Sequence, residues 1–350
     1  MKVAFLVFNH RGPEQLVRLL TTLRAQLPDS PLVVHHDVFH GELPSAVVEP
    51  VGNVHLLASG QRVVWGEFSM VDVLCWSLTW MREHLEFDWV VVLSGQDYPI
   101  KPLRGLADDL TANGADAVFG ATLIDQMPVL KRMIMHRRYF FRYRPAAAGR
   151  LPGGAREVLH RATWPLVQAL NILQPLFRIY RLTSHVPYRF GWRARNKPFN
   201  SEFPCWHAAT WCALSRGALE YMLDYVADQP DYVDYYRGTM CADESMLASI
   251  VCNAPHLRVA HRHITYTRWD NARSAHPDTF RAADFNHLLG VQQYFARKFD
   301  IAVDATILDA LDDFIAHDAP THSVLAKLSL PYVVSDAVSV VRVTEHREWR

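Results

Sequence analysis

VAFLVFNHRGPEQLVRLLTTLRAQLPDSPLVVHHD, residues 3–37, is the stretch that decides the fold class. It opens on a continuous apolar run, residues 3–8, of the kind that forms a strand buried on both faces. Leu16, Leu19, Leu20 and Leu23 then recur at helical spacing, and residues 31–36 return to a strand pattern. A strand, a helix and a second strand of these lengths predict a right-handed βαβ unit and therefore a parallel sheet.

The same alternation continues to residue 120. The pattern predicts a helix over 68–85, a strand over 89–93, a short helix over 103–110 and a strand over 115–120. Residues 1–120 are therefore expected to form a doubly wound, Rossmann-like half. Ligands of such sheets bind beyond the carboxyl ends of the strands. Here those ends are Asn9-His10, His35-His36-Asp37 and Ser94-Gly95-Gln96-Asp97.

The rest of the chain divides into two further parts. Residues 121–200 are predicted to be a basic, partly helical insertion, with an apolar helical stretch from about 159 to 182 that Pro165 and Pro175 interrupt. Residues 201–350 return to α/β alternation and complete a single catalytic domain. The elements expected there are a strand over 207–214, a helix from the N-cap Ser215 to 225, a helix over 243–251, a strand over 257–266, and helices over 284–295 and 305–316.

Composition excludes some function classes. Lysine plus arginine and aspartate plus glutamate both number 36, which argues against a nucleic-acid-binding protein with a broad basic surface. Five cysteines without CxxC spacing predict reduced, mostly buried thiols. The N-terminal apolar run is too short for a signal peptide, and no run is long enough to span a bilayer. These features favour a cytoplasmic protein.

Three ordered segments resemble one family. They are VVLSGQDYPIKP at 91–102; Glu202 with HAATWCALSR at 207–216 and ADE at 242–244; and YFARKFD at 294–300. Together they are similar to the core-2/I-branching β-1,6-N-acetylglucosaminyltransferases and the related peptide O-xylosyltransferases. With the opening strand, the resemblance spans roughly residues 1–300, apart from 121–200. The resemblance implies a GT-A-type fold in which residues 1–120 are the nucleotide-sugar-binding half. It also implies a UDP-sugar donor, with N-acetylglucosamine and xylose as the first candidate sugars, and inversion at the anomeric carbon. No metal or other cofactor is expected, and the chain is expected to be a soluble, bacterial-type member of the family.

The resemblance also implies a general base, which an inverting transfer needs to take the proton of the acceptor hydroxyl. The resemblance places Glu202 at the family's catalytic position, ahead of the small-residue strand; its chemistry alone favours a surface or N-capping carboxylate. Asp243, Glu244 and Trp206 are candidates for contacts with the acceptor or the sugar, although acids at a helix start are ordinary by dipole complementarity. Trp211 fits the core better, because it would lie in mid-strand.

A second group of residues is expected to bind the donor. Lys298 matches the family's diphosphate-binding lysine, with Arg273 or Arg281 as its partner, and a solvated lysine beside Asp300 is the alternative. The remaining residues expected to bind the donor are Asp37, Arg62, Gln96 and Asp97. For Asp97 the alternative role is to cap its own turn by a side-chain hydrogen bond to the backbone. The run His35-His36-Asp37 also fits metal ligands, but neighbouring strand residues point to opposite faces, which favours a uridine contact by Asp37.

The partners and rival functions follow from the same residues. The basic and aromatic stretch 131–144 predicts either a solvated face or a surface for a glycan, peptide or lipid-linked acceptor, with peripheral contact to an anionic membrane at its inner face. Two rival functions remain open: a metal-dependent UDP-sugar transferase that uses His35, His36 and Asp37, and a catalytically inactive nucleotide-sugar- or glycan-binding protein.

Overall fold

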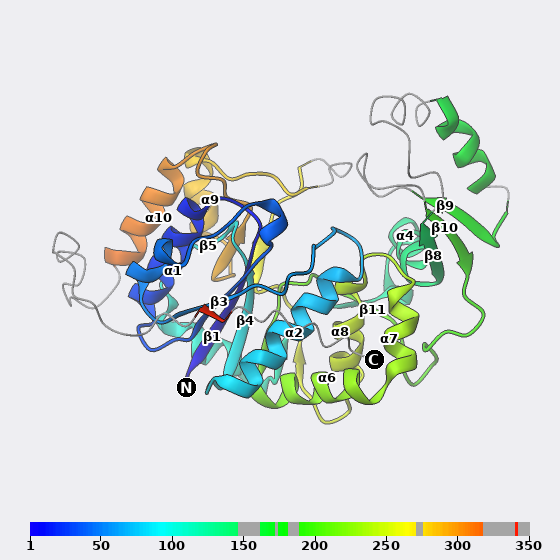
Figure 1. The fold of residues 1–350 in the computed structure, drawn as a ribbon, viewed down its shortest axis with the longest axis horizontal. Coiled ribbons are helices and arrows are strands. Elements are labelled where there is room, and N and C mark those ends of the chain that lie inside the picture. The colour runs from blue at the N-terminus through cyan, green and yellow to red at the C-terminus, as the bar shows by residue number, and fades with distance from the viewer. Residues whose placement is uncertain (146–161, 172–173, 181–188, 271–275, 318–339, 342–350) are drawn as a thin grey trace.

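The computed structural model describes residues 1–145, 162–171, 174–180, 189–270, 276–317 and 340–341. Within them the central element is an eight-stranded sheet with the order β13-β6-β12-β4-β1-β2-β3-β16 (Figure 1). Its strands are β1 (Val3–Asn9), β2 (Leu32–His36), β3 (Val54–Leu57), β4 (Trp89–Ser94), β6 (Ala117–Val118), β12 (Ala213–Ser215), β13 (Val259–Ala260) and β16 (Val340–Val341).

The sheet is parallel around β1, as the opening stretch predicts. Phe5 pairs with Leu32 of β2 on one side and with Val91 of β4 on the other, and all residues of β1 are buried. β12 breaks the pattern because it runs antiparallel to both β4 and β6. The C-terminal half of the chain therefore inserts a strand into the sheet that the N-terminal half begins.

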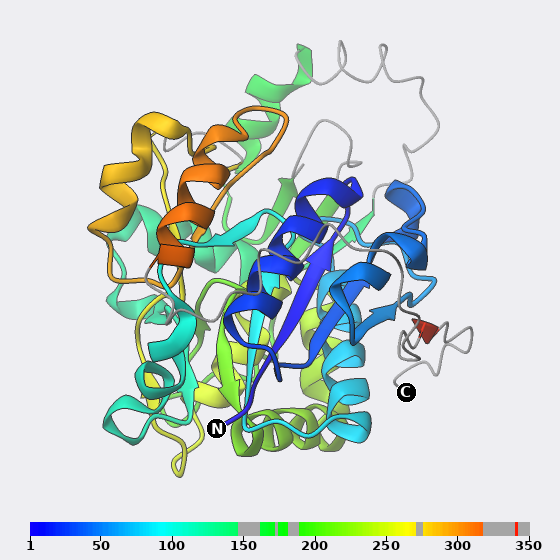
Figure 2. The ribbon, with the colours of Figure 1, turned by 90° about the vertical axis from the view of Figure 1, so that its left-hand side faces the viewer.

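Helices cover both faces of the sheet (Figure 2). Val3, Phe5 and Val7 face one apolar core, and Ala4, Leu6 and Phe8 face the other, as the two-residue period of a strand requires. The first core packs against α1 (Pro13–Gln26), α3 (Leu106–Thr111), α9 (Phe285–Leu289) and α10 (Thr306–His317). The second packs against α2 (Ser69–His84), α4 (Val129–Tyr139), α6 (Arg216–Asp228), α7 (Pro230–Arg237) and α8 (Met246–Cys252).

Three small sheets extend this core. They are β14-β15-β5, β11-β7 and β8-β10-β9. Their strands are β5 (Asp97–Pro99), β7 (Thr122–Leu123), β8 (Phe141–Pro145), β9 (Phe177–Tyr180), β10 (Arg189–Arg193), β11 (Trp206–His207), β14 (Thr265–Thr267) and β15 (Phe295–Arg297). Figure 1 shows β8, β9 and β10 at the end of the molecule opposite α1 and α10.

Several predicted elements are shorter or different. The strand expected over 207–214 is two strands in different sheets, because the segment between them bends to donate from the Ala208 amide to the Glu244 carbonyl. The strand over 257–266 is likewise split, and the helix over 284–295 ends at Leu289. Residues 162–171 are helical as expected, but after Pro175 the chain forms β9 instead of continuing the helix.

Two further expectations concern the whole chain. All five cysteines are free thiols, four of them buried, as expected. In the described residues, none of the helices combines the length and the apolar character needed to cross a bilayer.

Candidate active site

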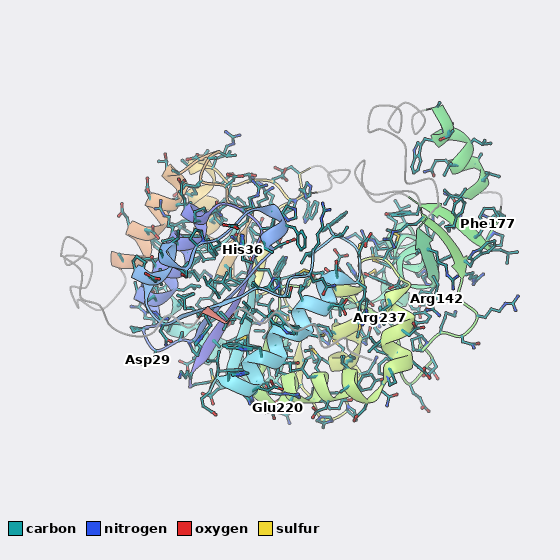
Figure 3. All side chains as sticks on the ribbon, in the orientation of Figure 1. Asp29, His36, Arg142, Phe177, Glu220 and Arg237 are labelled. Atoms are coloured by element: carbon teal, nitrogen blue, oxygen red, sulfur yellow. The ribbon has the colours of Figure 1, made fainter. Side chains whose placement is uncertain are left out.

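The carboxyl ends of β1, β2 and β4 meet at one edge of the sheet. The Asn9 side chain contacts His36 Nδ1 at 3.1 Å, and Figure 3 shows His36 at this edge. The Gly95 amide donates to the Phe8 carbonyl, and a Cβ on Gly95 would lie 2.4 Å from Asn9 Oδ1. Only glycine therefore lets the turn after β4 close against the end of β1.

A buried ion pair lies directly beyond β4. Asp97 is fully buried, and its Oδ1 lies 3.2 Å from Arg297 Nε, although the angle is too bent for a hydrogen bond. The guanidinium also lies over the Trp211 ring, 4.3 Å from its centroid. Burial raises the pKa of Asp97 to about 6 against the opposing effect of Arg297. Trp211 packs against the apolar core, as expected, but it lies in the bend before β12 and not in mid-strand, and its ring also supports a cation.

A pair of acids continues this line of contacts. Thr210, next to Trp211, donates to Asp243 Oδ2 at 2.7 Å, and the neighbouring Glu244 pairs with Arg138 of α4. Burial, and then the charge of Glu244, raises the pKa of Asp243 to about 6. Burial also raises the pKa of Glu244, while Arg138 opposes that shift. Glu244 is thus a partly exposed carboxylate with a raised pKa, which suits a general base.

Cations gather on the other side of Arg297. Lys298 is half-buried, and loss of solvent followed by the charges of Arg11 and Arg297 lowers its pKa. Arg11 Nη1 lies 3.1 Å from Asp300 Oδ2. Gln15 fixes this arrangement, since its amide donates to the Phe299 carbonyl and accepts from the Ile301 amide. The start of α1 is therefore held against the segment that carries Lys298.

Asp37 organises the turn after β2. Its carboxylate accepts from the Phe39 and Val63 amides and contacts His40 Nδ1 at 3.0 Å. The His40 ring meets the ring of His10, 5.7 Å away between centroids. Desolvation, followed by the charges of Arg11, His40 and Lys298, lowers the pKa of His10 to about 4. Asp37 thereby holds together two loops beside the cation group.

The run His35-His36-Asp37 does not converge on one point. His35 Nε2 lies 3.0 Å from Ser59 Oγ, whereas His36 Nε2 lies 2.8 Å from the Gly41 carbonyl oxygen. Burial lowers the pKa of His35 to about 4. Across the described part of the chain, there is no cluster of three or more His, Cys, Asp or Glu side chains arranged to hold a metal ion.

The side chains of Glu202 and Trp206 make no hydrogen bond or ion pair to Asp97, Arg297, Asp243 or Glu244 among the described residues. Glu202 is exposed in a turn where Asn200 Oδ1 accepts the Glu202 and Phe203 amides. No hydrogen bond or ion pair of the Glu202 carboxylate occurs among the described residues. Trp206 donates from Nε1 to Asn253 and stacks on the His261 ring, 5.0 Å between centroids, so one face of the indole is occupied.

The other residues expected to bind the sugar donor lie partly at this edge of the sheet and partly in the loops around it. Gln96 is buried and donates to the Phe299 carbonyl, so its side chain ties the turn after β4 to the Lys298 segment. Arg62 is exposed in the loop that Asp37 anchors. Arg281 is exposed after Phe280, whose amide donates to the Lys298 carbonyl. Arg273 lies outside the described residues.

Four buried polar atoms of the site have no hydrogen-bond partner among the described residues: Asp97 Oδ1, Arg297 Nε, Asp243 Oδ1 and Arg138 Nε. Buried polar groups are normally satisfied, because leaving one unpaired costs about 1–3 kcal/mol. All four belong to the line of contacts from Asp97 to Arg138. Asp97 Oδ1 and Arg297 Nε face each other as an ion pair, which leaves Asp243 Oδ1 and Arg138 Nε for a polar ligand to satisfy.

The sequence reasoning missed Arg297, Arg11 and Arg138 as site residues. Arg297 directly precedes Lys298, so the resembling segment contained it. Arg11 directly follows the first strand end, where ligands of such sheets bind. Arg138 was assigned to a surface patch, and no local signal predicts its pairing with Glu244, which lies 106 residues further along the chain.

Comparisons with known proteins give the family. The profile of the Core-2/I-Branching enzyme family matches residues 3–140 and 173–289. This chain belongs to that family. The family and the α/β, GT-A-like fold class expected from the sequence are thereby confirmed. Within residues 121–200, only 141–172 lie outside the match, so the part of the chain without family resemblance is shorter than expected.

The similar curated relatives of this family member are glycosyltransferases by name. The chain is 22% identical to beta-glucuronosyltransferase GlcAT14A and 25% identical to GlcAT14B, both from Arabidopsis thaliana. These matches cover 91% and 89% of the chain and 65% of each relative. Xylosyltransferase oxt from Drosophila melanogaster is 22% identical over 90% of the chain and 33% of its own length. The chain thus spans less than two thirds of these relatives.

Proposed function

We propose that this chain is an inverting glycosyltransferase that moves a sugar from a UDP-sugar to an acceptor hydroxyl without a metal ion. One observation carries the proposal: a line of contacts and chain neighbours runs from Asp97 and Arg297 through Trp211, Thr210 and Asp243 to Glu244. Lys298 directly follows Arg297 in the chain. The cation Lys298 and the carboxylate Glu244, whose pKa is raised, therefore lie at opposite ends of this line. A transfer from a diphosphate needs both.

The chemistry assigns a role to each end. Glu244 takes the proton of the acceptor hydroxyl, whose oxygen attacks the anomeric carbon from the face opposite the diphosphate. The bond from that carbon to the diphosphate oxygen breaks, and the negative charge grows on the leaving UDP. Lys298 and Arg11 meet this charge with donors already in place, which is the role a divalent ion has in other transferases.

The donor sugar follows from the relatives only as a short list of candidates. Glucuronic acid and xylose are named in the relatives, and N-acetylglucosamine is the candidate that the sequence added. The test is incubation of the protein with a panel of UDP-sugars, with and without a chelator, while UDP release is followed. We expect release from one or two donors that the chelator leaves unchanged. Loss of activity in chelator, restored by manganese, would favour the metal-dependent alternative.

Lys298→Ala is expected to weaken UDP binding about ten- to hundredfold, since a charged hydrogen bond to phosphate is lost. Arg11→Ala should weaken it by a smaller factor, about three- to tenfold, because Asp300 shares this exposed side chain. Titration calorimetry with UDP measures both, and Arg281→Ala is the matched control, expected to bind like the wild type. An Arg281 effect larger than that of Arg11 would restore Arg281 as the partner of Lys298.

The pH dependence of activity should report Glu244. Its pKa is raised, and the base works only when ionised, so kcat/KM falls as the pH drops through a value above that of an ordinary glutamate. Arg138→Gln removes the positive charge that holds the pKa of Glu244 down. The pH below which kcat/KM falls should therefore rise by about one unit or more. Arg142 pairs with Asp234 instead, so Arg142→Gln should leave the pH at which kcat/KM falls unchanged. Equal profiles for the two variants would contradict this role of Arg138.

A further inference from the structure

Positive charge is concentrated in residues 121–200. The whole chain is balanced, but this stretch has fifteen lysines and arginines against two acids, Asp125 and Glu157. The cations are Lys131, Arg132, Arg137, Arg138, Arg142, Arg144, Arg150, Arg156, Arg161, Arg178, Arg181, Arg189, Arg193, Arg195 and Lys197. A surface that carries part of this excess attracts a polyanion.

The sheet β8-β10-β9 has one face packed inward. Phe141 and Tyr143 of β8 are buried with Met240, and Tyr180 packs against them. Gly191 of β10 belongs to this face, since a Cβ there would lie 2.3 Å from the Tyr143 ring. Side chains alternate along a strand, so the neighbours of Gly191 point to the opposite side.

The opposite side, which we term the outer face, combines apolar side chains with arginines. Phe190 is directly across from Arg144 and Ile179, and Trp192 is across from Arg142 and Phe177. The Trp192 and Phe177 rings lie 5.7 Å apart between centroids, as partners on one face do. Figure 3 labels Arg142 and Phe177 at this end of the molecule, far from His36.

The outer face is exposed although it is largely apolar. Trp192 is 61% exposed and Phe190 43%. Of the fifteen large apolar side chains that are exposed in the described residues, nine lie between residues 121 and 200. No described carboxylate pairs with Arg144. Exposed apolar area of this extent beside a cation that has no described carboxylate partner usually marks a binding surface.

We propose that the outer face docks onto an anionic lipid bilayer. Tryptophan and phenylalanine favour the boundary between headgroups and acyl chains, and arginines beside them meet the phosphates. The aliphatic side chain of Ile179 favours lipid over a glycan, because a sugar offers stacking faces but no hydrocarbon. This binding is independent of the transferase reaction and would bring the enzyme to a membrane surface.

The arginines of this stretch do not all contribute. Arg138 is ruled out, because its side chain is largely buried and pairs with Glu244. Arg189 lies on the inner face with Gly191 and pairs with Glu67. Arg142 pairs with Asp234, but both side chains are about half or more exposed, so this pair offers little competition to a phosphate.

The experiment is sedimentation of the full chain with phosphatidylcholine vesicles that contain or lack phosphatidylglycerol. We expect the protein to pellet only with the anionic vesicles, at low salt, and to be released at high salt. Phe190→Ser with Trp192→Ser should lower the partition coefficient about ten- to thirtyfold, from the lost apolar burial. Arg142→Ser with Arg144→Ser should lower it about 25-fold, each arginine contributing about fivefold.

Two controls match these changes in chemistry, and the tryptophan control also matches in exposure. Trp269→Ser removes a 50% exposed tryptophan from another loop, and Arg82→Ser removes a surface arginine of α2. Both should bind vesicles like the wild type. A gain-of-signal measurement avoids folding artefacts: Trp192→Cys carrying an environment-sensitive dye should shift its emission to the blue on anionic vesicles. The proposal is overturned if the wild type does not pellet, if the outer-face variants bind like the controls, or if only a soluble anionic polysaccharide binds.

Discussion

Glu244→Gln lowers the turnover number by about two to four orders of magnitude and leaves UDP affinity nearly unchanged. The substitution keeps the shape of the side chain and a hydrogen-bond acceptor for Arg138 but removes the ability to take a proton, and a positioned base has about this effect on a rate. Initial rates of transfer with saturating donor, together with UDP titration, measure the two quantities separately.

Glu202→Gln is the matched control for this result. The resemblance described in the sequence analysis implied Glu202 as the base, yet its side chain is exposed in the Asn200 turn. We expect the Glu202 variant to retain near-normal turnover. The opposite pattern, a slow Glu202 variant beside an active Glu244 variant, would return the base to Glu202 and remove Glu244 from the mechanism.

Asp97→Leu lowers the free energy of unfolding by about 3–5 kcal/mol, because it leaves the largely buried Arg297 charge without its partner. Chemical denaturation followed by circular dichroism measures the change. The double variant Asp97→Leu with Arg297→Met should regain most of the loss, since a buried pair can be replaced by apolar groups at little cost.

Asp234→Leu is the comparison for the buried pair, because Asp234 forms an exposed ion pair with Arg142. Its effect should stay within about 0.5 kcal/mol. A single Asp97 variant as stable as the wild type, or a double variant no better than the single, would show that the contact between Asp97 and Arg297 contributes little to the fold.

The parallel centre of the fold was predictable because its sequence signal is local. The apolar runs at 3–8 and 89–93 contain enough adjacent apolar residues to require burial on both faces, and they form β1 and β4. Ser215 was predicted as an N-cap, and its hydroxyl accepts from the Ala218 amide. Such features depend on neighbours in the chain.

The site was less predictable because distant contacts determine it. The sequence of residues 207–214 predicts one strand, yet the Ala208 amide donates to the Glu244 carbonyl and the chain bends there. The bend places Thr210 beside Asp243 and Trp211 beside Arg297. The sequence around Arg138 predicts only one more arginine of a basic surface, whereas in the structure Arg138 pairs with Glu244. Lys298 was identified only through a family motif, since composition alone does not separate it from a solvated lysine.

The antiparallel strand β12 has a consequence for how the chain is made. In the described sheet, β6 pairs only with β12 and β13, so the first 120 residues cannot complete the sheet they begin. During synthesis, β4 therefore has an open edge until residue 215 has emerged. Unpaired edges of apolar strands invite pairing between chains. Residues 1–120 are thus not a separable unit, and a truncated chain that ends before β12 should be prone to aggregation.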